Sequence, residues 1–265
     1  YDGEAFVAVA RSYSDQAEHI RYARFSAQGL LTQPTVIASA GDGPSVGGFL
    51  PFMTLSVVAQ ASQAVVGFKR ERFDQRLDMN IQRNHIAVVD RSGTVVFNEE
   101  LSTELNLSFD QEVSVHRVGD QVVTLWTTTD LTSDEANPPY LLYGNETDLE
   151  VGPSRWRPLL LADQPLDRTD FALAEDPNGY GQMLWQDLRF RAEDEGERLR
   201  LMTASLSDDF RLGEPKVLDH PRVFLGVSHP KILYHRDQFI MTWVDVRHSE
   251  GQTIKSEIYL ESMRP

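Results

Sequence analysis

A short apolar run that ends in Trp-x-Asp-x-Arg recurs along this chain at a nearly constant spacing. The clearest copy is QFIMTWVDVR at 238–247, and GQMLWQDLR at 181–189 repeats it with its tryptophan 58 residues earlier. Weaker copies are QVVTLWTTTD at 121–130, QAVVGFKRER at 63–72 with phenylalanine in the tryptophan position, and EAFVAVARS at 4–12. Recurrence at a fixed period of this length is the signature of a repeat architecture.

Each repeat divides into short apolar segments separated by turn residues. In the second repeat these segments are Ala64–Phe68, Ile86–Val89, Val95–Phe97 and Val113–Val118. Strands this short, with almost no helical periodicity between them, predict an all-β fold. Four antiparallel strands repeated radially form the blade of a β-propeller. The four and a half repeats therefore predict a five-bladed β-propeller of four-stranded antiparallel blades, with a period of about 58 residues.

We expect one propeller domain over residues 1–265. Its predicted repeats lie near 1–58, 59–118, 119–176, 177–235 and 236–265. The fifth repeat lacks its last strand, and the first lacks the strand that should precede Glu4. The ring is therefore expected to close irregularly, unless a strand lies outside this sequence.

The repeat resembles the tandem propeller repeats of bacterial secreted and surface proteins. In those proteins a hydrophobic strand ends in Val-Trp-x-Asp-x-Arg and is followed by an Ile-Tyr strand and a turn with glycine. Here MTWVDVR with EIYLES, and MLWQDLR, carry the likeness, together with turn glycines at Gly93, Gly152 and Gly213. The likeness covers most of the chain and weakens towards the N-terminus. It implies a propeller fold and a secreted, periplasmic or cell-surface location, but no particular activity.

Composition narrows the classes of partner. A formal net charge of −15 argues against a nucleic-acid or anionic-membrane partner, because either requires a cationic footprint. There is no cysteine, so disulfides, thiolate metal sites and cysteine nucleophiles are all excluded. The uncharged stretch Gly43–Phe68 is long enough to span a membrane. Its polar turn at 59–62 and its β-branched residues instead predict a buried hairpin and no membrane span.

Loop lengths carry the main functional inference. The loops predicted after the tryptophan-bearing strands are long: 11–19, 69–85, 127–139, 186–198 and 244–255. Those leading into the next inner strand are also long: 38–51, 98–112, 162–170 and 219–229. In an up-and-down blade these two loop families leave on the same side. We therefore expect one plain face and one elaborate face, with function on the elaborate one.

The polar residues of the repeat are candidates for ligand binding on that face. They are predicted to lie just past the strand ends, and their structural interpretation is a repeated ion-pair network. The alternative is a polar funnel in which arginines bind a carboxylate or phosphate bidentately. The binding candidates are Arg70, Arg72, Glu112, Arg189, His229 and Arg247.

Carboxylates at the same face raise the alternative of catalysis. Several acidic residues around a propeller mouth resemble the arrangement in five-bladed glycoside hydrolases, which use an acid/base pair about 5–10 Å apart. The candidates for such a pair are Asp110, Asp170, Asp187 and Asp245. No signature of those enzymes is present, and the sialidase Asp box is missing. DRSGTVVF at 90–97 is only a faint echo of that box and predicts a plain hairpin turn.

Metal and cofactor chemistry is weakly indicated. The seven histidines show no metal-ligand spacing, so no metal site is predicted. Acidic loops at 130–135 and 193–197 are candidates for Ca²⁺, but solvated loops are the simpler interpretation. The predicted loop 69–83 carries a local excess of two positive charges, which would steer an anionic ligand.

Three hypotheses remain from the sequence. The first is an extracytoplasmic propeller that binds a glycan or protein partner through its long-loop face. The second is a glycoside hydrolase with axial carboxylates. The third is a structural module of a larger surface protein.

Overall fold

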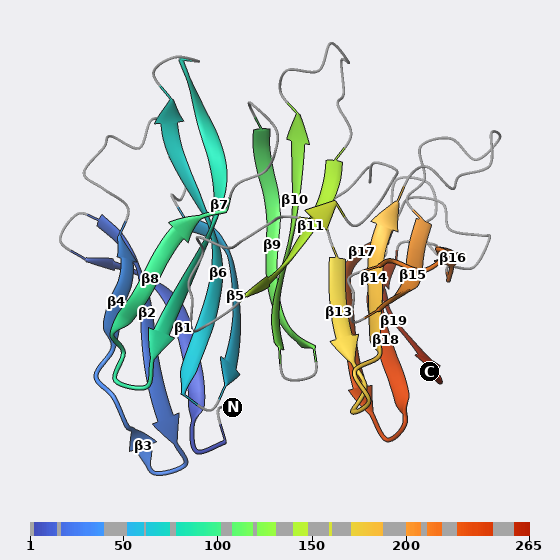
Figure 1. The fold of residues 1–265 in the computed structure, drawn as a ribbon, viewed down its shortest axis with the longest axis horizontal. Helices are drawn as coiled ribbons and strands as arrows, with labels where there is room; N and C mark the ends of the chain where they lie inside the picture. The colour runs from blue at the N-terminus through green and yellow to red at the C-terminus, as the bar shows by residue number, and fades with distance from the viewer. Residues whose placement is uncertain are drawn as a thin grey trace. The chain divides into compact units, whose positions relative to one another are not determined.

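The structure is a computed structural model in which every regular element is a β-strand, so the all-β prediction is confirmed for the described residues (Figure 1). The described residues are 3–14, 17–39, 52–60, 62–74, 78–101, 108–118, 121–130, 140–147, 159–160, 171–187, 200–207, 211–218, 227–245 and 257–265. In this part of the chain no helix is long and apolar enough to cross a membrane.

The described strands form five antiparallel sheets. Sheet 1 contains β1 (Phe6–Ser14), β2 (Ala17–Ser26), β3 (Gly29–Leu30) and β4 (Thr35–Ser39). Sheet 2 contains β5 (Phe52–Gln60), β6 (Gln63–Asp74), β7 (Met79–Asp90) and β8 (Val95–Glu100). Sheet 3 contains β9 (Ser108–Val118), β10 (Gln121–Asp130), β11 (Tyr140–Thr147) and β12 (Leu159–Leu160). Sheet 4 contains β13 (Phe171–Glu175), β14 (Gly181–Asp187), β15 (Arg200–Leu206) and β16 (Lys216–Val217). Sheet 5 contains β17 (Val227–His235), β18 (Gln238–Asp245) and β19 (Glu257–Met263).

The chain divides into two compact units, which are described separately. Unit 1 comprises residues 1–117, 121–138 and 143–158, and unit 2 comprises 118–120, 139–142 and 159–265. Sheets 1 and 2 with most of β9 and β10 belong to unit 1, and sheets 4 and 5 belong to unit 2.

The sheets are offset by one strand from the sequence repeat. The last apolar segment of the first repeat forms β5, which pairs with β6 through a tight turn that joins Gln60 to Gln63. This is the hairpin that was predicted in place of a membrane span. Sheet 1 begins at β1, without a described strand before it, and sheet 5 ends at its third strand.

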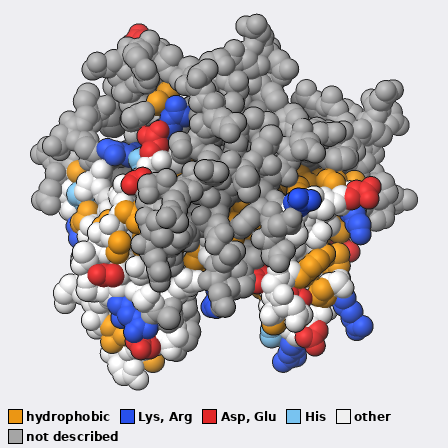
Figure 2. Space-filling view, viewed as in Figure 1, with side chains coloured by type: hydrophobic (Ala, Val, Ile, Leu, Met, Phe, Trp, Pro, Cys, Tyr) orange, Lys and Arg blue, Asp and Glu red, His pale blue; other side chains and the backbone are white. Residues whose placement is uncertain are grey.

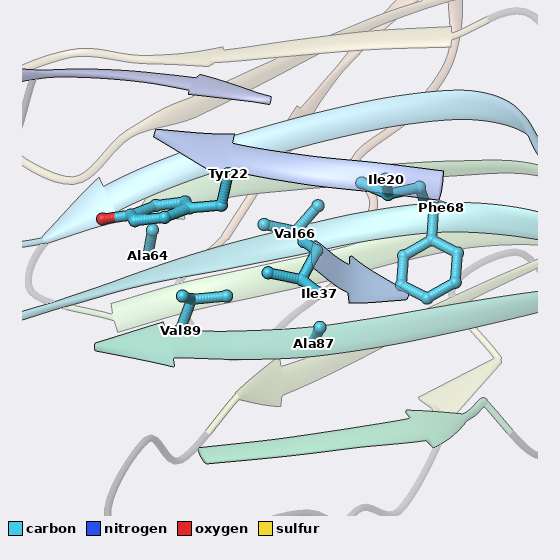
Figure 3. Packing of buried hydrophobic residues seen from close by; sticks show 8 residues of the cluster. All are labelled: Ile20, Tyr22, Ile37, Ala64, Val66, Phe68, Ala87 and Val89. Carbon is cyan, nitrogen blue, oxygen red and sulfur yellow. The ribbon is translucent and has the colours of Figure 1, made fainter. Parts of the chain in front are cut away.

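Sheets 1 and 2 pack face to face in unit 1. Alternate residues of β2 and β6 point into the space between the sheets and form a continuous apolar cluster (Figure 3). The buried members are Ile20, Tyr22, Ile37, Ala64, Val66, Phe68, Ala87 and Val89. Burial of each larger aliphatic or aromatic side chain contributes about 1.5–3 kcal/mol. This layer holds the two sheets together.

The opposite face of sheet 2 packs against β9. A Cβ added at Gly67 would lie 2.8 Å from Val115 Cγ2 and 3.1 Å from Val113 Cγ2, so only glycine allows the observed approach. At the same contact the Val115 amide donates to Ser56 Oγ at 2.9 Å, which satisfies a backbone group at the edge of β9. The middle strand β6 is therefore buried on both faces.

Sheets 4 and 5 pack in the same manner in unit 2. Leu184 and Leu201 of sheet 4 bury Met241 and Trp243 of sheet 5. Trp243 also stacks on Tyr259, with ring centroids 6.0 Å apart. The tryptophan of the repeat thus fills the space between neighbouring sheets.

Two predicted long loops are in fact strands, so those predictions are wrong. The predicted loop 11–19 is a hairpin in which Ser14 pairs with Ala17. The predicted loop 69–85 is a β-ribbon in which β6 and β7 pair as far as Asp74 and Met79. The charged residues of this ribbon break the apolar pattern, but ladder hydrogen bonds come from the backbone and do not require apolar side chains.

The contact at Gly67 yields a stability prediction. Gly67→Ala should lower the free energy of unfolding by about 1–3 kcal/mol, because the added methyl group overlaps Val115. Urea denaturation of the four members of the Gly67→Ala and Val115→Ala cycle measures this. The cost of Gly67→Ala should be smaller in the Val115→Ala background; equal costs in both backgrounds would show that the two sheets do not meet at this point.

Candidate functional site

Each unit has two different ends. We call the turn end the one where short connections join β5 to β6 and β7 to β8 in unit 1, and β13 to β14 and β17 to β18 in unit 2. We call the loop end the opposite one, where β6 and β10 end in unit 1, and β14 and β18 end in unit 2 (Figure 1). Most of the long connections start or finish at the loop ends, as the sequence predicted.

In unit 1 the predicted site residues gather at the loop end. Arg70 pairs with Phe52 at the start of β5 and with Arg83 on β7. Arg72 pairs with Ile81, so both arginines lie within β6 and not past its end, which corrects the sequence prediction. Asp110 and Glu112 belong to the first part of β9, which begins at the same end (Figure 1). The side chains of Arg72, Asp110 and Glu112 lie outside the described part.

In unit 2 three predicted residues gather at the loop end. Tyr180 contacts Phe239 with centroids 6.2 Å apart, so β14 and β18 start together at the turn end. Asp187 is the last residue of β14, Asp245 is the last residue of β18, and Asp245 pairs with Val227 two positions before His229. The backbone therefore brings these positions to one end, while their side chains lie outside the described residues.

Three further candidates lie outside the described residues: Asp170, Arg189 and Arg247. Most of the acidic loops 130–135 and 193–197 also lie outside them. Within the described ranges no group of three or more histidine or acidic side chains is arranged to hold a metal ion.

Buried polar residues near the loop end of unit 1 were missed by the sequence reasoning. Lys69 is 4% exposed and Asn84 is fully buried, and they pair across β6 and β7 on the face that Gly67 turns to β9. Between sheets 1 and 2, Glu18 is 7% exposed and its Oε1 lies 3.9 Å from Arg11 Nη1. Burying polar groups costs free energy unless they are paired, and none of these three side chains is without a partner. The sequence signal for these buried polar residues is a charged residue, Lys69, that directly follows the apolar run of β6.

The acidic turns at the turn end have a structural role. Asp90 Oδ1 accepts from the Ser92 hydroxyl at 2.6 Å, from the Ser92 amide at 2.8 Å and from the Thr94 amide at 2.9 Å. Gly93 has φ of +90°, which glycine adopts without strain. The segment 90–97 is therefore the plain hairpin turn that the sequence predicted.

Asp176 builds a second turn of the same design. Its Oδ1 accepts from the amides of Asn178 at 2.8 Å and Tyr180 at 2.9 Å.

Both turn aspartates have lowered pKa values. The hydroxyl of Ser92 holds the pKa of Asp90 below its ordinary value, against the smaller effect of burial. Burial by itself would raise the pKa of Asp176, but the hydrogen bonds from Tyr180 and Asn178 together lower it.

The visible surface carries no patch of a single charge among the described side chains; acidic and basic groups lie interspersed (Figure 2). The net charge of −15 is thus not gathered on the part of this face that is described.

Comparison with known proteins finds similarity of fold. No protein-family model matches the chain, and no curated protein matches it significantly. The structure is similar to an α-L-arabinofuranosidase from Fusarium graminearum in complex with an iminosugar inhibitor, with a TM-score of 0.60 and 9% identity over 98% of this chain and 72% of that one. It is also similar to a thermostable family-43 glycoside hydrolase, with a TM-score of 0.50 and 12% identity over 76% of this chain and 66% of that one. At these identities the likeness shows a shared all-β fold.

The acidic turns yield a pH prediction. A lowered pKa in the folded state means that the ionised carboxylate stabilises the fold above the unfolded-state pKa, and that this stability is lost as pH falls through the folded-state pKa. Asp90→Asn should therefore lower the free energy of unfolding by about 1 kcal/mol at neutral pH. The difference from wild type should shrink as pH falls below the ordinary aspartate pKa of about 3.9 and through the lowered folded-state pKa.

Denaturation curves at several pH values measure this difference. Glu99→Gln removes an exposed carboxylate from β8 and is the matched control. A cost of Asp90→Asn that is the same at acidic and neutral pH would contradict the role assigned to the ionised form.

Proposed function

We propose that the protein is a five-bladed β-propeller with glycoside hydrolase activity at its loop ends. The observation that carries this proposal is the likeness of 98% of the chain to the fold of an arabinofuranosidase, at a TM-score of 0.60. The chain is acidic, and carboxylate positions gather at the strand ends where a propeller presents its loops. Glycoside hydrolysis needs little beyond two well-placed carboxyl groups.

The propeller arrangement explains the sheet contacts within each unit. Sheet 1 packs on sheet 2 and sheet 2 on β9 in unit 1, and sheet 4 packs on sheet 5 in unit 2. Sheet 2 packs through both of its faces, as a radial blade does. The recurrence of the tryptophan positions supports the same arrangement, and with it kinship to the secreted and surface propeller repeats. An extracytoplasmic location goes with that kinship.

The proposed chemistry uses two carboxyl groups on either side of a glycosidic bond. One, with a raised pKa, protonates the leaving oxygen, and the other acts as nucleophile or activates a water molecule. The pair is drawn from Asp110, Asp170, Asp187 and Asp245. Arg70 at the loop end of unit 1, and His229 at the loop end of unit 2, are each candidates to bind hydroxyl groups of a substrate.

A second candidate function is supported by the loop asymmetry. Long connections gather at the loop end of each unit, and binding surfaces are commonly built from loops on a rigid scaffold. The same surface would then bind a glycan or a protein partner without catalysis.

Substitution of the acidic candidates tests the hydrolase. Wild-type protein should release the aryl group from at least one of a panel of aryl glycosides that includes α-L-arabinofuranoside. Asp187→Asn or Asp245→Asn should lower kcat by about 10²–10⁴-fold if that residue belongs to the pair, because such factors are typical of acid–base groups.

The control for this experiment is Asp90→Asn, which changes a carboxylate at the turn end and should leave kcat unchanged. Absence of turnover by wild type across pH 4–8, with the fold intact by circular dichroism, would reject the hydrolase. Binding of the same protein on a glycan array, lost in Arg247→Ala, would then support the binding module.

A further inference from the structure

The geometry points to a binding site for an oxyanion on sheet 1, formed by Ser12, Ser14, His19, Arg21 and Ser39, and suited to the carboxylate or sulfate group of an acidic sugar. The assignment of the ligand as a sugar rests on the proposed function, whereas the binding of an oxyanion does not.

Three strands bring these side chains to one face of sheet 1. On β1 and β2, Ser12 pairs with His19 and Ala10 with Arg21. Ser39 of β4 pairs with His19. The intervening residue Ile20 points to the other face, into the core shared with sheet 2. The cluster therefore lies on the face of sheet 1 that is turned away from sheet 2.

The cluster occupies the strand positions that carry the polar residues of the repeat. Ser12 and Ser14 lie 58 residues before Arg70 and Arg72, the positions that hold the aspartate and arginine of Trp-x-Asp-x-Arg in later copies. They stand at the loop end of unit 1, where β1 finishes. The first copy of the repeat thus has Ser12 and Ser14 where later copies have the aspartate and arginine. The charged residue beside these serines is Arg21 of β2.

Arg21 is the central cation of the cluster. Its Nε donates to Ser12 Oγ at 2.8 Å and its Nη2 donates to Ser14 Oγ at 3.1 Å. Among the described residues, these neutral hydroxyl groups are its partners and no carboxylate lies within ion-pair distance. The protein has 40 acidic residues, so an arginine without an acidic partner in the described part of the chain stands out. The serines fix the plane of the guanidinium without neutralising its charge, and Nη1 remains free to bind a carboxylate or sulfate oxygen.

His19 supplies a second, directed group. Its Nε2 lies 3.1 Å from the Ser14 carbonyl oxygen, which can only accept, so Nε2 carries a proton. Its Nδ1 lies 2.8 Å from Ser39 Oγ. When an anion binds, the hydroxyl of Ser39 can turn its proton from His19 Nδ1 to the anion. The guanidinium and three hydroxyl groups would then face one oxyanion.

The surface next to the cluster suits a sugar chain. Along the same face the side chains are small at Ala8, Ala10 and Ala23, which pair near Arg21. Beyond them Phe6 and Phe25 stack with centroids 5.6 Å apart and are 51% and 38% exposed. Phe25 is four residues from Arg21 on β2, or about 13 Å along an extended strand. Aromatic surface with a few fixed polar groups is the usual composition of a ligand site.

Nuclear magnetic resonance titration tests the site with defined probes. Glucuronate and a sulfated glucose should each shift the His19 imidazole and Arg21 Nε–H signals in a saturable manner at millimolar concentration. Neutral glucose, the matched probe, should leave them unchanged. Arg21→Gln should weaken binding of both acidic sugars at least tenfold, and Ser39→Ala should weaken it less while leaving Arg21 in place. Arg236→Gln, which removes a charge at the turn end, should bind as wild type does.

Each outcome bears on the site. A preference for one acidic sugar identifies the oxyanion and supports the site. Saturation by inorganic sulfate without any response to the acidic sugars would overturn the sugar assignment, and no shift with any probe would overturn the site. Because the titration needs no hydrolysis, binding by a protein that turns over no aryl glycoside would separate failure of the hydrolase from failure of this site.

Discussion

The burial of both faces of the middle strands is the constraint on which the rest of this structure depends. On β6, Val66 and Phe68 enter the core shared with sheet 1, while Gly67 lies against β9. A strand covered on both faces must be apolar along its whole central part, unlike the half-buried strand of an exposed sheet. This explains why the repeat is marked by an apolar run that ends in a large aromatic residue. The same burial holds the ends of the middle strands in fixed positions, and a functional site built on those ends requires this.

Polar groups appear where this packing stops. At the turn end they complete the chain reversal, since the carboxylates of Asp90 and Asp176 bind backbone amides within their own turns. Towards the loop end they face neighbouring sheets, as Lys69 and Asn84 do beside the β9 contact. Polar side chains therefore stabilise chain reversals at one end and lie buried between packed strands near the other. A carboxylate next to a glycine turn is weak evidence of a catalytic site.

Sheet 1 differs from the later sheets at the polar positions of the repeat, where we place the oxyanion site. Where Asp187 and Asp245 end their strands with an acid, the equivalent position in β1 is Ser12, and the charge comes from Arg21 on the next strand. A repeated scaffold allows one copy to change while the others keep the packing, because a repeat contacts only its neighbours. The proposed catalysis and the proposed recognition of a charged group can thus be placed on different sheets.

The sequence by itself determined the strand type, the hairpin with its turn at 59–62 and the turn at Asp90. Those features follow from the preferences of neighbouring residues: the apolar run, the glycine with positive φ and the aspartate that binds its own turn. Only the tertiary structure decided that 69–85 is a ribbon, that Gly67 admits a neighbouring sheet and that Arg21 has hydroxyl groups in place of a carboxylate. Each of these depends on a partner distant in the sequence, so a local pattern carries no record of it.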